Sequence, residues 1–150
     1  IRRNPATGRL DILLGSGDEP EVLLIPRGFV RDGESPEDTV RRVVELETGW
    51  TSPDSVEEPF YDGYIYDARQ TDHAWVETVA YLLEADPTER VDGSRPGNPF
   101  SEIGWWPLEA ATVNRIPPVL AGLVRDAVRR LAESGRMDTE DASRLLVATG

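Results

Sequence analysis

The segment PRGFVRDGESPEDTVRRVVELETGW, from Pro26 to Trp50, constrains the fold more than any other part of the chain. Ser35 and Pro36, followed by two acids, are typical of a helix start. Serine caps the free N–H groups, proline fits the first turn and acids favour the positive end of the helix dipole. Gly49 is typical of a helix end. The segment therefore predicts a glycine-containing loop followed by a helix that ends near Gly49.

Strands are expected before and after this helix in the sequence, and further helices are expected toward the C-terminus. The expected strands are Leu10–Leu14, Glu21–Pro26, Phe60–Asp67, Ala74–Glu84 and the IGWWPL stretch at 103–108, and the expected later helices are Val119–Ser134 and Thr139–Ala148. This order predicts an α/β protein in which a mixed sheet is sandwiched between helices. A length of 150 residues suits one domain spanning 1–150.

The net charge of −12 argues against nucleic acid and anionic membranes as partners, since both would repel the chain. No apolar run approaches the roughly 20 residues that a membrane-spanning helix needs. The chain has no cysteine, which excludes disulfides and thiol chemistry and favours a cytoplasmic location. A homodimer is compatible with these observations.

The expected helix carries one acid that a solvated face does not explain. Val40, Val43 and Val44 form an apolar stripe, and Glu47 lies one turn beyond Val43 at its edge. Two interpretations stay open at this point. Glu47 is a surface acid that reaches past the stripe to water, or it is a metal ligand.

The segment resembles a Nudix box in which the spacing is kept and some of the acids are missing. The matching positions are Gly28, Glu34, Arg42, Val44, Glu47, Gly49 and Trp50. The family pattern has glutamate where this chain has Val43 and Leu46. The resemblance implies a Nudix fold and a carboxylate site for Mg²⁺ or Mn²⁺ that acts on a diphosphate.

The roles implied by this resemblance fall on four residues. Glu47 is the expected metal ligand, Glu34 is expected to organise the loop, and Arg42 is expected to orient the helix carboxylates. Glu102, next to the polar loop Asp86–Ser101, is the expected downstream acid. A single carboxylate together with ligand phosphates is compatible with Mg²⁺, which often keeps several of its waters.

The stretch YDGYIYDARQTDHAWVETVAYLLE, residues 61–84, is similar to a strand pair of the mitochondrial-type ADP-ribose pyrophosphatases. It also resembles the ADP-ribose-binding domain of the melastatin-type cation channel. Both resemblances imply that Asp67 and Arg69 contact ADP-ribose, and Arg27, Asn114 and Arg115 are further expected ligand contacts. An ion pair within the turn explains Asp67 and Arg69 equally well by residue type.

Three functions follow from these patterns. The first is a Mg²⁺-dependent pyrophosphohydrolase of reduced activity, acting on ADP-ribose or a related nucleoside-diphosphate compound. The second is an inactive module of the same fold that binds such a nucleotide. The third is an interaction domain with an empty pocket.

Overall fold

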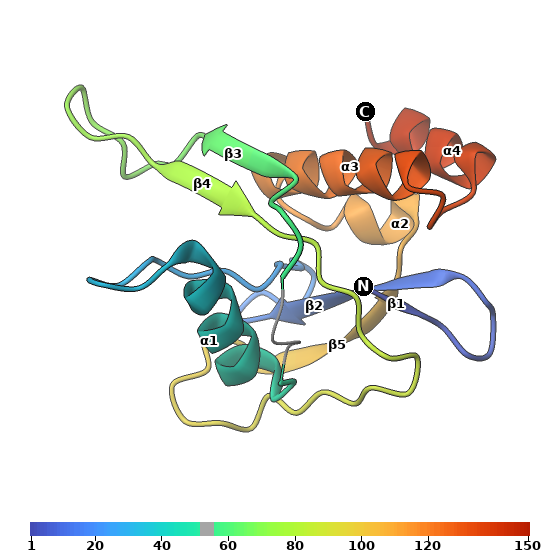
Figure 1. Ribbon diagram of the computed structural model, residues 1–150, viewed down its shortest axis with the longest axis horizontal. Coiled ribbons are helices and arrows are strands. Elements are labelled where there is room, and N and C mark those ends of the chain that lie inside the picture. Colours follow the sequence, from blue (N-terminus) through green and yellow to red (C-terminus); the bar gives the residue numbers. More distant parts are fainter. Residues whose placement is uncertain (52–55) are drawn as a thin grey trace.

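The computed structural model describes residues 1–51 and 56–150 (Figure 1). Its strands are β1 (Arg2–Arg3), β2 (Leu10–Ser16), β3 (Tyr61–Tyr64), β4 (Glu77–Ala80) and β5 (Glu102–Pro107). Its helices are α1 (Pro36–Thr48), α2 (Ala110–Val113), α3 (Pro118–Glu133) and α4 (Thr139–Thr149).

The central sheet has the order β1-β2-β5, with β2 antiparallel to both neighbours. A parallel bridge between Arg2 and Ala85 adds the mixed character that the sequence predicts. Strands β3 and β4 form a separate antiparallel hairpin, in which Tyr64 pairs with Glu77. Figure 1 shows this hairpin extending away from the sheet, with its turn far from α3 and α4.

Helices lie on both sides of the central sheet, as expected (Figure 1). Alternate residues of β2, namely Leu10, Ile12 and Leu14, pack into a core with α3 and α4. A smaller cluster that includes Val44 and Trp50 packs α1 on the other side, with Trp105 against it. The larger core therefore holds the C-terminal helices to the sheet, while α1 rests on fewer apolar contacts.

The expected strand Glu21–Pro26 is wrong. Only Leu24 pairs with β2, through reciprocal bonds to Gly15 of 2.9 and 2.8 Å. Pro20 and Pro26 border the segment, and neither has an N–H to donate to a ladder. Strands β3 and β4 are shorter than expected, and β1 and α2 were not expected from the sequence. Across the described residues, no helix has the length and apolarity to cross a membrane.

Candidate functional site

Helix α1 is capped at both ends as the sequence predicts. The Ser35 hydroxyl accepts a bond from the N–H of Asp38 at 3.1 Å. At the other end Gly49 has φ of 70°, and its N–H donates to the carbonyl of Glu45. A residue other than glycine rarely adopts this left-handed conformation. Local sequence therefore fixes where α1 begins and ends, and with it the direction in which its side chains point.

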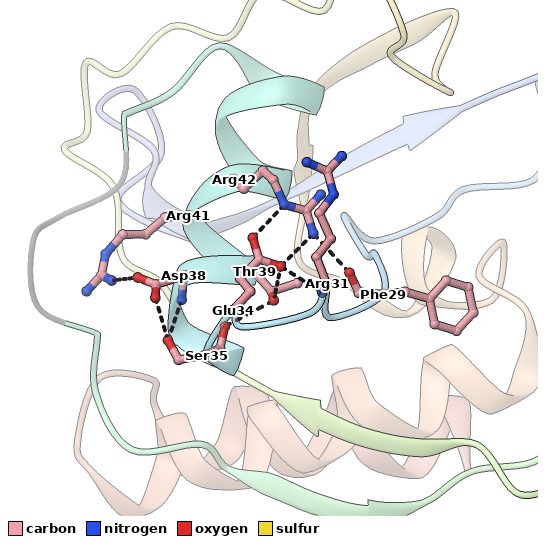
Figure 2. Close-up of polar contacts among 8 residues, drawn as sticks. All are labelled: Phe29, Arg31, Glu34, Ser35, Asp38, Thr39, Arg41 and Arg42. Atoms are coloured by element: carbon pink, nitrogen blue, oxygen red, sulfur yellow. Dashed lines mark hydrogen bonds and ion pairs between the residues drawn. The ribbon is translucent and has the colours of Figure 1, made fainter.

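Arg42 of α1 holds the preceding loop through Glu34 (Figure 2). Its Nε and Nη2 donate to the two carboxylate oxygens of Glu34 at 2.7 and 2.9 Å, and Nη2 also donates to the carbonyl of Phe29 at 2.9 Å. The Thr39 hydroxyl and the Arg31 N–H donate to Glu34 at 2.7 and 3.0 Å. We call these five residues the loop clamp.

The loop clamp keeps Glu34 ionised. Hydrogen bonds from Arg42, and to a smaller extent from Arg31 and Thr39, together lower the pKa of Glu34 to about 2, against the opposing effect of burial. Both oxygens of Glu34 already accept bonds from the protein. Glu34 therefore serves the loop in this structure, and Arg42 makes its bonds to the loop with Val43 and Leu46 in place.

Glu47 is buried, which rules out the interpretation of a surface acid that reaches to water. The residue is only 4% exposed. Its Oε2 has no hydrogen-bond partner among the described residues. Burial raises the pKa of Glu47 to about 7, although the N–H and the charge of Arg27 act in the opposite direction. Glu47 is thus a half-satisfied carboxyl group that changes charge near neutral pH.

The acids around Glu47 do not make a resident metal site. Within residues 1–51 and 56–150, no group of three or more acids or histidines could hold a metal ion. Val43 and Leu46 provide no ligand, whereas Mg²⁺ and Mn²⁺ require several oxygens. Glu102 is exposed at the start of β5, beside an open hollow of about 430 Å³ that it lines with Asp92. A resident Mg²⁺ or Mn²⁺ held by the chain alone does not fit these residues.

Asp67 and Arg69 form the ion pair that residue type alone explains. Arg69 Nε donates to Oδ1 of Asp67 at 2.7 Å, its Nη2 donates to Oδ2, and its backbone N–H donates to Oδ1 at 2.8 Å. These bonds hold the pKa of Asp67 well below its usual range. The Arg69 guanidinium also lies over the ring of Phe29, 4.6 Å from its centroid. The hairpin turn therefore contacts the loop before α1.

Two of the other expected ligand contacts lie at the end of α2, away from the hairpin turn. Arg115 donates from Nε and Nη2 to the carbonyls of Glu21 and Pro20, each at 3.0 Å, and stacks over Trp106 at 4.7 Å. Asn114 is the exposed C-terminal cap of α2. Arg115 thus braces the segment around Glu21 against β5, and no contact among the described residues joins it to Arg69.

The sequence interpretation missed Phe29 and Thr39. Thr39 follows the helix start by one turn, where its hydroxyl reaches Glu34. Phe29 is the one aromatic residue in the glycine-containing segment 26–34, and that was the available signal. Its contact with Arg69 joins residues 40 positions apart, which no local spacing rule addresses.

The sequence and the fold were compared with those of known proteins. The NUDIX domain model matches residues 3–127. The NUDIX domain of Shewanella oneidensis NrtR, solved in complex with ADP ribose, is similar, with a TM-score of 0.63 and 26% identity over 83% of this chain and 80% of that one. No curated protein matches the sequence significantly.

Two further structures share the fold at lower identity. A MutT/nudix family protein from Enterococcus faecalis has a TM-score of 0.69 and 21% identity, and the match covers 98% of this chain and 63% of that one. The MutT protein from Methanosarcina mazei Go1 has a TM-score of 0.57 and 17% identity over 91% of each chain. Since the family model spans most of its length and the box residues stand in register around α1, the chain belongs to the Nudix family.

Proposed function

We propose that this Nudix domain binds ADP-ribose or a related nucleoside-diphosphate compound, and that recognition rather than hydrolysis is its main activity. The observation that carries the proposal is the state of Glu47, a buried acid with one unpartnered oxygen that belongs to no metal-binding group of three or more side chains within the described residues. The bonds of the loop clamp form without an acid at position 43 or 46. Together these observations support a domain that keeps the loop and helix of the Nudix box but has little hydrolytic activity.

The ligand class is supported by the NrtR domain, whose structure contains ADP ribose. Arg69 is the proposed phosphate contact, because an arginine presents parallel N–H groups that match phosphate oxygens. Asp67 holds that arginine in place. Arg27, exposed beside Glu47, is the second proposed cationic contact. In a chain of net charge −12, such local cations are needed to attract a diphosphate.

Slow hydrolysis dependent on Mg²⁺ or Mn²⁺ is the second candidate, and the retained Glu47 favours it. A divalent cation that arrives as a complex with the diphosphate would find one buried carboxylate on the helix. Nothing specific favours the third candidate, an interaction domain with an empty pocket. A cytoplasmic location belongs to the proposal, because the absence of cysteine fits a reducing compartment.

The test is calorimetric titration of ADP-ribose in EDTA and then in Mg²⁺, followed by chromatography of the same samples for AMP. We expect binding in EDTA and no AMP in either sample. The variant Arg69→Ala should weaken binding, while Arg144→Ala, an exposed and ion-paired arginine on α4, should not. AMP that forms only with Mg²⁺ and disappears in Glu47→Gln would favour the second candidate. No binding in either buffer would overturn both.

A further inference from the structure

Phe29 has a contact pattern that neither the core nor the box motif requires. The residue is 66% exposed, so its ring gains little from burial. Its carbonyl is held by Arg42 of the loop clamp at 2.9 Å. One face of its ring is covered by the guanidinium of Arg69. The backbone of Phe29 is therefore fixed to α1 while its ring reaches the hairpin turn.

Arg69 is held in two independent ways. Asp67 accepts from Nε and Nη2, which fixes one edge of the planar guanidinium. The Phe29 ring lies against its face at 4.6 Å. The end of the guanidinium formed by Nη1 and Nη2 keeps N–H donors that Asp67 does not use, and Nη1 has no hydrogen bond among the described residues. The side chain remains 61% exposed, so a ligand can reach that end.

We infer that Phe29 is a positioning residue for phosphate recognition, whose ring holds Arg69 so that the N–H groups at the Nη1–Nη2 end of the guanidinium donate to oxygens of a diphosphate. This inference rests on the proposed function. An arginine that is already immobilised loses less side-chain entropy when a ligand binds, and the gain appears as affinity. The inference also gives Arg42 a task in this chain, since Arg42 fixes the loop that carries Phe29.

A double-mutant cycle tests this role. ADP-ribose is titrated in EDTA into the unaltered chain, Phe29→Ala, Arg69→Ala and the double variant. Phe29→Ala should weaken binding about two- to fivefold, the effect of losing an exposed cation–π contact. In the Arg69→Ala background the same change should have no further effect, because Phe29 acts through Arg69. Phe29→Tyr should restore affinity and Phe29→Leu should not, whereas Val30→Ala, an exposed neighbour on the same loop, should leave affinity unchanged.

A measurement without ligand checks the contact itself. The δ protons of Arg69 should be shifted upfield by the Phe29 ring in the NMR spectrum of the unaltered chain, and Phe29→Leu should abolish that shift. Unshifted protons would overturn the inference. So would a loss of affinity in Phe29→Ala that persists unchanged without Arg69, or an unaltered affinity in Phe29→Ala while Arg69→Ala weakens binding. Failure of the unaltered chain to bind ADP-ribose would overturn the proposed function and the inference together.

Discussion

Replacing Glu47 by glutamine should stabilise the protein, and only above mildly acidic pH. The folded state raises the pKa of Glu47 from an ordinary 4.5 to about 7, mainly by burial. The folded protein therefore holds the proton more tightly than the unfolded chain does. This tighter binding of the proton stabilises the folded state fully below pH 4.5, and the stabilisation is lost as the pH rises through about 7. Glutamine resembles the protonated acid and has no charge to lose.

The expected size follows from the same two values. A rise from 4.5 to about 7 corresponds to roughly 3 kcal/mol at about 1.4 kcal/mol per pKa unit. Local relaxation and entry of water reduce such penalties, so we expect a gain of about 1–2 kcal/mol in the free energy of unfolding above pH 8. Near pH 4.5 the two proteins should differ little.

Urea unfolding of both proteins at pH 5, 7 and 8.5 provides the measurement. The matched control is Glu45→Gln, an exposed acid on α1 whose side chain lies 3.4 Å from Arg95. Its stability relative to the unaltered chain should be almost independent of pH, since exposed pairs contribute little. Parallel pH profiles for Glu47→Gln and the unaltered chain would refute the reasoning, because they would mean that Glu47 is ionised as easily in the fold as in water.

Three other changes have defined outcomes. Ser35→Ala removes the N-cap acceptor of α1 and should lower the free energy of unfolding by about 1 kcal/mol in a urea titration. Gly49→Ala should be more destabilising in the same assay, because φ is 70° and the new Cβ would lie 2.9 Å from the carbonyl oxygen of Asp92. Leu46→Glu places a second acid beside Glu47, and we expect AMP release from ADP-ribose with Mg²⁺ to exceed that of the unaltered chain, measured by chromatography.

The parts of the fold that depend on neighbouring residues could be predicted from the sequence. Ser35 and Gly49 each act within one helical turn, so the bounds of α1 followed from residue types alone. Residues four apart on a helix lie close together, so Asp38 is within reach of Arg42 by spacing alone. In the structure Arg42 bonds to Glu34 and Asp38 bonds to Arg41. The choice between those partners depends on how the loop turns back over the helix, which spacing does not encode.

The state of Glu47 and the surroundings of Arg69 depend on distant segments. Glu47 lies at the edge of an apolar stripe, and the sequence left its exposure open because burial depends on other segments, among them the one whose Arg27 N–H bonds to it. Arg115 shows the same limit. The family resemblance implied a ligand contact for Arg115, but the path of the chain around Pro20 gives it two carbonyl acceptors instead.

The loop clamp separates the shape of the loop before α1 from the acids that α1 carries. Because Arg42 already bonds to Glu34 and the Phe29 carbonyl, neither an acid at position 43 nor one at position 46 is required to keep the loop in shape. Substitutions at those two positions can therefore accumulate without unfolding the motif. The spacing of the glycines, Glu34 and Arg42 is therefore independent of whether acids stand at positions 43 and 46. A sequence pattern that scores spacing will detect chains with and without those acids equally readily.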